Sequence, residues 1–208
     1  MLLLFASFNN QPTHPMKSSS IDYTPLGLFA FSLTSILVNL HGLGLFPLNA
    51  LIISMALIFG GGTQLFIGLV EYKQGHTFVG ITFSAYGLYW LSYVGILLFP
   101  LLNVSLTPPT ALIGCYFLLW GIFTSIMAII ARQLSLIDFV IFTSLALLYL
   151  LLALHQFIPS PSINTMASLV GILCGCCAFY LAVAKILQQE LGVYFLPIGM
   201  NLLTKTKE

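Results

Sequence analysis

Long apolar runs separated by short polar or proline-rich breaks make up most of this sequence. A helix needs about 20 apolar residues to cross the hydrocarbon of a bilayer. Six runs of that length are present, at 26–46, 50–70, 78–99, 111–131, 136–157 and 165–187. The breaks contain typical turn residues, such as Pro47 and the stretch PSPSIN at 159–164. The pattern therefore predicts an all-α membrane protein with six transmembrane helices per protomer.

The same runs divide the chain into parts. We expect a disordered or dispensable N-terminal tail at 1–21, a six-helix transmembrane domain at 22–190 and a short cytoplasmic tail at 191–208. The opening MLLLFASF is too short to span a bilayer and lacks the basic residues that begin a secretory signal. The sequence favours translation from Met16, just before Lys17.

Composition and charge support the membrane class and suggest an orientation. Of 208 residues, 59% are hydrophobic and 5% are charged, whereas an ordinary soluble domain has about 25% charged residues. The net charge of +1 excludes the basic field that nucleic acid binding requires. All six cations lie in the N-terminal tail, the second and fourth links or the C-terminal end. By the positive-inside rule, both termini are predicted to be cytoplasmic.

Polar side chains within the spans are informative, because lipid cannot satisfy a buried amide or hydroxyl group. The first two spans each place polar and small residues on one face, at three- and four-residue spacing. These stripes are Phe31, Thr34, Ser35, Val38, Asn39 and Gly42 in the first span, and Gly60, Gln64, Gly68 and Glu71 in the second. We expect both stripes to face the interior of the bundle.

The glycines leave two interpretations open. The triplet at 60–62 either allows close helix packing or weakens the helix before Gln64, which would free backbone carbonyls at membrane depth for a small solute. For the last span, close packing is favoured clearly. Its small-residue seam is predicted to be scaffold and consists of Ser168, Gly171, Gly175, Ala178 and Ala182.

The remaining reactive residues favour structural roles. The four cysteines, three of them in LCGCCAF at 173–179, do not resemble a disulfide framework or a zinc site. No HExxH, GxSxG or close pair of intramembrane carboxylates occurs, so neither an enzyme nor a cofactor is expected.

Charged and titratable groups are expected near the ends of spans. Glu71 and Asp138 are predicted to pair with Lys73 and Arg132 or to be solvated, because charges at helix ends cost little. Lys185 is predicted to extend to the membrane surface. For His41 and His155, interfacial hydrogen bonding is favoured over acid sensing.

Several motifs, in order along the chain, resemble one known family. They are TPLGLFAF at 24–31, ILVNLH at 36–41, FGGGTQLFIGLVEYKQGHTF at 59–78, SAYGLYWL at 84–91 and FLPIG at 195–199. With them, the chain resembles the acetate uptake transporter family, the succinate–acetate permeases, from about residue 22 to residue 199.

The resemblance implies a six-helix protomer in a homohexamer of the inner or plasma membrane, with its own conduit for acetate and, in some members, succinate. It also implies a hydrophobic constriction formed by Phe31, Tyr86 and Leu145, and it places Gln64 near the substrate path. The expected path residues are Thr34, Asn39, Gln64 and Glu71. Proton-coupled permeation and channel-like diffusion both stay open as mechanisms.

The start of the family signature departs from the usual pattern. The family usually begins it with Asn-Pro, whereas this chain has Asp22-Tyr23-Thr24-Pro25. Asp22 is expected to cap the first helix, and the alternative is that it repels carboxylates at the entrance.

Two other functions stay open at this point. One is a non-transporting membrane sensor or scaffold, and the other is a channel for a different small solute such as ammonia. The chain after residue 187 is too short for an output domain, which favours transport over sensing.

Overall fold

The computed structural model describes residues 21–102, 107–192 and 195–199. Its elements are α1 (Thr24–Gly42), α2 (Ala50–Met55), η1 (Ala56–Thr63), α3 (Gln64–Lys73), α4 (Thr77–Leu101), α5 (Thr110–Ala131), α6 (Leu136–Phe157) and α7 (Pro161–Leu191). Because α2, η1 and α3 run on without a break, the described residues contain six helices that are long and apolar enough to cross a membrane. The predicted all-α, six-span architecture is confirmed. The predicted start at Met16 and most of both predicted tails lie outside the described residues.

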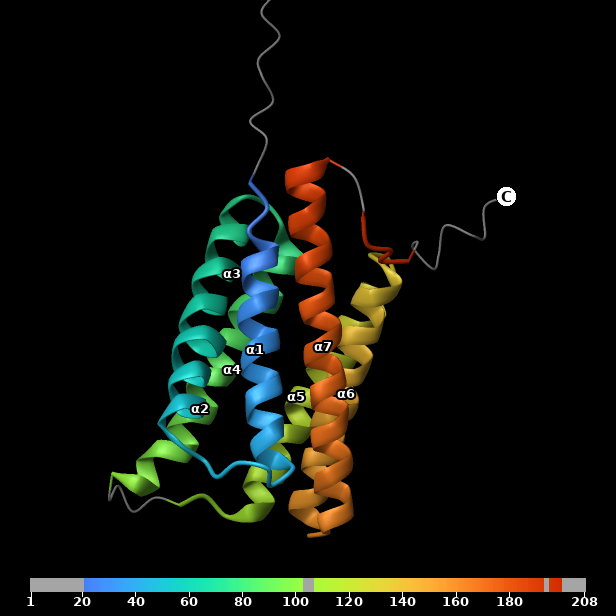
Figure 1. Ribbon diagram of the computed structural model, residues 1–208. Coiled ribbons are helices and arrows are strands. Elements are labelled where there is room, and N and C mark those ends of the chain that lie inside the picture. Colours follow the sequence, from blue (N-terminus) through green and yellow to red (C-terminus); the bar gives the residue numbers. More distant parts are fainter. Residues whose placement is uncertain (1–20, 103–106, 193–194, 200–208) are drawn as a thin grey trace, which may run out of the picture.

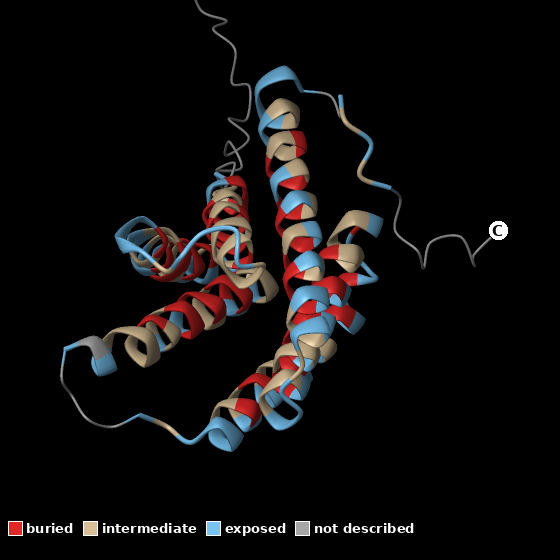
Figure 2. Ribbon diagram, turned by 60° about the horizontal axis from the view of Figure 1, so that its bottom comes forward, coloured by how far each residue is buried: buried red, intermediate tan, exposed pale blue. Residues whose placement is uncertain are grey.

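The helices run antiparallel, so α1 begins and α7 ends at the same end of the bundle (Figure 1). We call this the terminal end, and the other the opposite end. Figure 2 shows two groups, α1–α4 and α5–α7, with their buried residues on the sides where helices face one another and many exposed residues outside. The groups are joined chiefly where α1 packs against α7. Large apolar side chains such as Phe66, Leu119 and Ile129 are exposed, as a lipid-facing surface requires.

Small residues allow α1 and α7 to approach closely. A Cβ atom added to Gly171 would lie 2.3 Å from the side-chain amide of Asn39, and one added to Gly175 would lie 2.7 Å from Ile36. Ser168, Ala178 and Ala182 in the same seam are buried. The prediction that this seam is scaffold is confirmed.

The glycine triplet lies in η1, a π-helical stretch between α2 and α3. A Cβ at Gly60 would collide with Trp90, and one at Gly61 would collide with Leu91. The packing interpretation is therefore correct for these two glycines. The helix is also altered, but by widening into a π-helix rather than by breaking. Such stretches are rare and occur often at functional sites, and this one ends where Gln64 begins α3.

Candidate functional site

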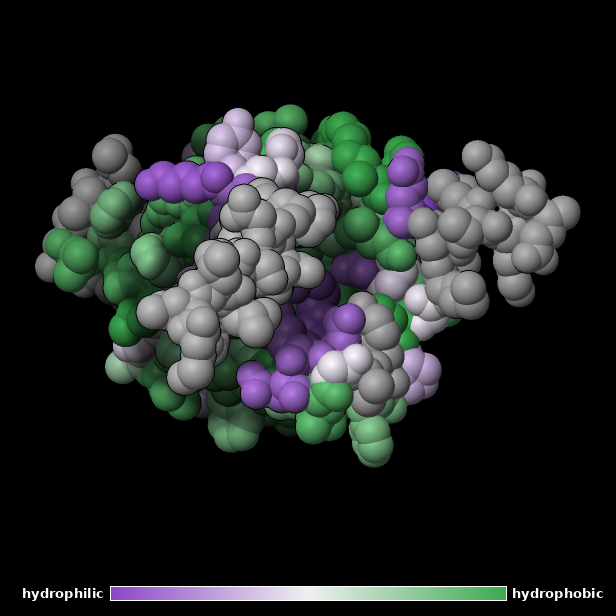
Figure 3. All heavy atoms as spheres, turned by 90° about the horizontal axis from the view of Figure 1, so that it is seen from above, coloured by the Kyte–Doolittle hydropathy of each residue, from purple (hydrophilic) through white to green (hydrophobic). Residues whose placement is uncertain are grey.

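A cavity of about 300 Å³ lies inside the half of the bundle nearer the terminal end. Helices α1, α3, α4, α6 and α7 and the segment 195–199 supply its wall, which is mostly apolar. Its polar lining residues are Thr24, Gln64, Thr82, Ser135, Asp138 and Lys185. Figure 3 looks onto the terminal end and shows hydrophilic side chains gathered in the middle, among hydrophobic ones. We call this the first cavity.

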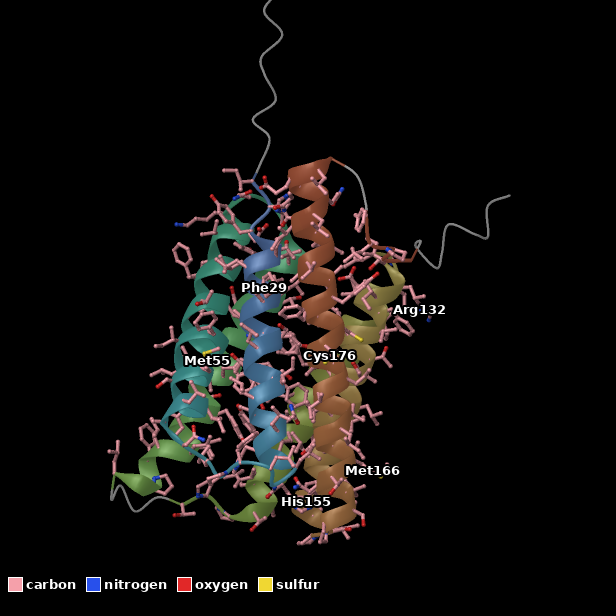
Figure 4. All side chains as sticks on the ribbon, viewed as in Figure 1. Phe29, Met55, Arg132, His155, Met166 and Cys176 are labelled. Atoms are coloured by element: carbon pink, nitrogen blue, oxygen red, sulfur yellow. The ribbon has the colours of Figure 1, made fainter. Side chains whose placement is uncertain are left out.

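A second cavity of about 360 Å³ lies in the other half of the bundle. Its wall includes Asn39, Asn164 and His155, and Figure 4 shows His155 near the opposite end. Tyr89 and Tyr93 also line it, and their rings are stacked with centroids 5.8 Å apart. The two cavities thus occupy successive depths of the bundle.

Phe31 and Leu145 line both cavities, so these two side chains stand between them. Tyr86 lines the first cavity, and its ring centroid lies 6.5 Å from that of Phe31. The Tyr86 hydroxyl donates a hydrogen bond of 2.9 Å to Thr124 Oγ1, which fixes the ring from α5. The structure therefore places Phe31 and Leu145, from α1 and α6, at the boundary between the cavities, and Tyr86, from α4, lies next to Phe31 on the side of the first cavity.

Gln64 is the most unusual polar residue of the site. Its side chain lines the first cavity and is 0% exposed, and neither Nε2 nor Oε1 has a hydrogen-bond partner among the described residues. Leaving a buried donor or acceptor unsatisfied costs about 1–3 kcal/mol. Nε2 can donate to a carboxylate, and Oε1 can accept from a protonated carboxyl group. An amide kept free at such a cost is suited to a polar solute or water in the cavity.

The other predicted path residues on the first two spans are placed differently. Asn39 lines the second cavity, and its Nδ2 donates a 2.8 Å hydrogen bond to the Ser35 carbonyl oxygen. Thr34 is buried, lines neither cavity, and donates to the Met55 carbonyl oxygen at 3.2 Å. Thr34 thus ties α1 to α2, whereas Asn39 has its side chain at a cavity wall.

Glu71 lines neither cavity. The prediction that it is solvated or paired with Lys73 is wrong, because the carboxylate is 0% exposed. It accepts a 2.6 Å hydrogen bond from the Tyr23 backbone N–H and contacts His76 Nδ1 at 2.5 Å. Since Tyr23 directly precedes α1, Glu71 fastens the start of α1 to α3 and the following link.

Asp138 and Arg132 do not form the predicted pair either. Asp138 accepts a 2.5 Å hydrogen bond from Ser135 Oγ, which in turn accepts the Asp138 backbone N–H and caps α6. The guanidinium of Arg132 lies over the ring of Phe139, 5.8 Å from its centroid. The Asp138 carboxyl group instead faces the first cavity, which sequence reasoning missed.

Lys185 and Asp22 meet at the terminal end. Lys185 lines the first cavity rather than extending freely to the surface, and its Nζ lies 3.4 Å from Asp22 Oδ2. Asp22 Oδ1 accepts the backbone N–H of Thr24, the first residue of α1, at 2.8 Å. The N-cap position itself is Tyr23, so Asp22 bonds the helix start from one residue further out than the expected cap. Burial alone would raise the pKa of Asp22, but hydrogen bonds from Thr24 and the charge of Lys185 hold it below the ordinary value.

Two histidines lie near the opposite end and line the second cavity. His41 Nδ1 lies 2.8 Å from the Phe46 carbonyl oxygen, and His155 Nδ1 lies 3.1 Å from that of Ser160. The expectation of ordinary hydrogen bonding near the interface is confirmed.

Comparison with known proteins gives a consistent result. Residues 5–202 match the GPR1/FUN34/yaaH family. The chain is 40% identical to the "Succinate-acetate/proton symporter SatP" of Escherichia coli (strain K12), over 84% of this chain and 93% of that protein. It is 31% identical to the "Ammonia transport outward protein 3" of Saccharomyces cerevisiae, over 75% of this chain and 59% of that protein. The solved "Structure of the bacterial acetate channel SatP" superposes with a TM-score of 0.84 at 39% identity, covering 86% of this chain and 99% of that chain.

Proposed function

The chain belongs to the GPR1/FUN34/yaaH family, and from this premise we propose that each protomer carries acetate across the membrane, together with the dicarboxylate succinate and other small monocarboxylates. The observation that carries the proposal is the amide of Gln64, which has no hydrogen-bond partner among the described residues. It lines the first cavity together with Phe31 and Leu145, and the second cavity shares these last two residues. Two cavities in series, with an unpartnered donor in one, fit passage of a small polar solute better than a packed core.

The energetics of the path favour a small acid bound weakly. Moving a bare carboxylate into a low-dielectric medium costs tens of kcal/mol by Born estimates, so the solute needs donors along the path or must travel protonated. Gln64 supplies a neutral donor at the first cavity and Asn39 an amide at the second. A hydrogen bond from such an amide contributes about 1 kcal/mol net to a protonated acid and about 1.5–3 kcal/mol to a carboxylate, and either value suits weak binding and fast release.

In this proposal Phe31, Tyr86 and Leu145 select by size and by excluding water. Their mostly apolar side chains cannot replace the water molecules that a strongly hydrated ion would lose in the constriction. A two-carbon acid has only one carboxyl group to dehydrate, and its methyl group is compatible with apolar side chains. Thr34 and Glu71 act on the path indirectly. Their hydrogen bonds with Met55 and Tyr23 hold α1 in place against the second span. Gln64 and Asn39 contact the solute.

Flux of labelled acetate in proteoliposomes tests the proposal. Saturable uptake above that of empty vesicles is expected, and no uptake by correctly folded protein would refute it. An imposed pH gradient separates the two mechanisms. Accumulation of acetate beyond passive weak-acid partitioning would indicate proton coupling, which is the mechanism that the name of the Escherichia coli symporter states. Equilibration of acetate without accumulation would indicate a channel, which is the term used for the solved SatP structure.

We propose that the protein is a homohexamer of the inner or plasma membrane, with cytoplasmic termini and no catalytic reaction. The exposed apolar side chains of the spans can contact lipid or a neighbouring protomer. Native mass spectrometry of detergent-extracted protein is expected to give six chains per particle, and a monomer as the only species would contradict this assembly.

Ammonia is the second candidate solute, because a family relative has the name of an ammonia transporter. The predominantly apolar wall with neutral amides is compatible with a small uncharged molecule. Ammonia flux that matches or exceeds acetate flux in the same vesicles would favour this alternative. A non-transporting sensor would carry neither solute.

A further inference from the structure

The carboxylate of Asp22 is held by two donors at the terminal end. Oδ1 accepts the backbone N–H of Thr24 at 2.8 Å, and Oδ2 lies 3.4 Å from the ammonium of Lys185. Thr24 is the first residue of α1, and Lys185 lies on α7, near its end. Both donors belong to residues that line the first cavity. The N-terminus of α1 and the ammonium of Lys185 thus both contact the Asp22 carboxylate. We call this place, at the terminal end of the first cavity, the mouth of the proposed path.

The two donors would suit any carboxylate of small size. Backbone N–H groups at a helix N-terminus favour anions, and an ammonium donates to carboxylate oxygens. The contact with Lys185 is longer than the 2.7–2.9 Å typical of charge-assisted hydrogen bonds. The side chains of Lys185 and Asp22 are 26% and 37% exposed, so water and salt screen their attraction. The contact of Asp22 with Lys185 is therefore long and partly solvated, whereas its hydrogen bond from Thr24 has an ordinary length.

Lys185 is distinctive within the lining of the two cavities. Among the described residues, it is the one Lys or Arg side chain that lines either cavity. The other charged group facing the first cavity is Asp138, whose carboxyl group is hydrogen-bonded by Ser135. Deeper along the wall, Gln64 offers only a neutral amide. Within the cavity walls formed by the described residues, a carboxylate therefore meets a lysine or arginine charge only at Lys185.

We propose, on the basis of the transport function above, that Lys185 and the N–H of Thr24 form a carboxylate-exchange site at this mouth. Asp22 is its built-in ligand, and the transported carboxylate takes the place of Asp22 as it enters or leaves the first cavity. Competition from a tethered carboxylate keeps the affinity low and the release fast. Lys185 is thus a specificity-determining residue for anionic carboxylates, and Asp22 sets how strongly they bind.

Two single substitutions have opposite expected effects. Asp22→Asn keeps an oxygen that can accept the Thr24 N–H, but it removes the charge that competes for Lys185. It is expected to lower the KM for acetate about two- to fivefold at neutral pH. This factor corresponds to the small free energy of a solvent-screened ion pair, which acetate would no longer have to displace. Lys185→Gln removes the positive charge and is expected to raise the KM by a similar factor. Lys73→Gln removes a positive charge from an exposed side chain that lines neither cavity, so it serves as the matched control, with a KM close to that of the parent.

The measurement is labelled-acetate uptake by the full chain in proteoliposomes, at low and at high salt. Salt is expected to raise the KM of the parent and to affect Lys185→Gln less, because screening acts on the lysine charge. If the pair only fastens α1 to α7, Asp22→Asn and Lys185→Gln will both reduce uptake, and this result overturns the proposal. A KM unchanged by both substitutions overturns it as well.

Failure of this inference can be distinguished from failure of the transport function. If the parent carries acetate and both mouth variants have the parent KM, only the exchange site is refuted. If the parent carries no acetate, transport is refuted, and the site is then tested by thermal unfolding with added acetate. Stabilisation that increases in Asp22→Asn and disappears in Lys185→Gln supports the exchange site, and equal behaviour of all three proteins refutes it.

Discussion

Replacing Gln64 by leucine is expected to separate stability from transport. Leucine has a similar size and removes the two buried polar atoms that lack partners in the described structure. A residue that stabilises the fold through hydrogen bonds would destabilise the protein when replaced in this way. For Gln64 we expect the reverse, with a fold at least as stable as the parent and a strong loss of acetate flux.

The size of both effects follows from hydrogen-bond energetics. Each unsatisfied buried group costs about 1–3 kcal/mol, so Gln64→Leu is expected to stabilise the fold by about 1 kcal/mol or more. In a chain of this length, about 1 kcal/mol shifts the melting temperature by about 2–4 °C. A hydrogen bond to a charged carboxylate contributes about 1.5–3 kcal/mol, so its loss weakens binding about ten- to hundredfold.

The assay combines thermal unfolding in detergent with labelled-acetate uptake in proteoliposomes, on the same preparations. Ser32→Ala is the matched control. Ser32 is buried and lines neither cavity, and its hydroxyl donates to the Phe29 carbonyl oxygen at 3.1 Å. This control is expected to lose about 1 kcal/mol of stability and to keep its flux. A Gln64→Leu protein that melts earlier but carries acetate at the parental rate would refute the reasoning.

Three further predictions concern the constriction, the scaffold and the mouth. Phe31→Ala is expected to admit larger acids such as butyrate, measured as flux relative to acetate, and an unchanged ratio would exclude a size filter at this position. Gly171→Val is expected to lower the melting temperature by several degrees, because its side chain would collide with Asn39, whose amide lies 2.3 Å from a Cβ at that site. A variant as stable as the parent would mean that the α1–α7 contact is looser than described. Since the pKa of Asp22 is held below its ordinary value, the ionised group stabilises the fold above that value, and this contribution is lost as pH falls through the lowered pKa. The difference in melting temperature between the parent and Asp22→Asn should therefore shrink on acidification, and a constant difference would contradict the pairing.

The helical framework could be predicted from sequence because bilayer thickness fixes the length of an apolar run. The α1–α7 seam could be predicted for a similar reason, since small residues at helical spacing have few other uses in a membrane. The observed α7 extends beyond the predicted 165–187 at both ends, because turn residues such as Pro161 are also tolerated in the first turn of a helix.

Other features depended on contacts that span the sequence. The position of Glu71 at the end of a span predicts pairing with Lys73 or solvation, but the structure buries it, and its partner is the backbone N–H of Tyr23, just before α1. Asp138 and Lys185 are far apart in the chain, and only the fold places both at the first cavity. No spacing rule predicts that these two residues line the same cavity.

Some features of the site left a signal in the sequence, although Tyr89 and Tyr93 were missed. Tyr86, Tyr89 and Tyr93 recur at three- and four-residue spacing, so they share one face of α4. The first lines the first cavity and the other two line the second. The glycine triplet likewise indicated an altered helix before Gln64, although propensity alone does not distinguish a π-helix from a break.

Chemical block at the boundary between the two cavities tests the central claim most directly. Leu145 lines both cavities, so we would introduce Leu145→Cys after replacing Cys115, Cys174, Cys176 and Cys177 by alanine. A small methanethiosulfonate reagent is expected to abolish acetate flux through this protein, and acetate is expected to slow the modification. The cysteine-free parent should be unaffected. A protein that is fully modified at position 145 and still carries acetate at the unmodified rate would contradict a path past Phe31 and Leu145.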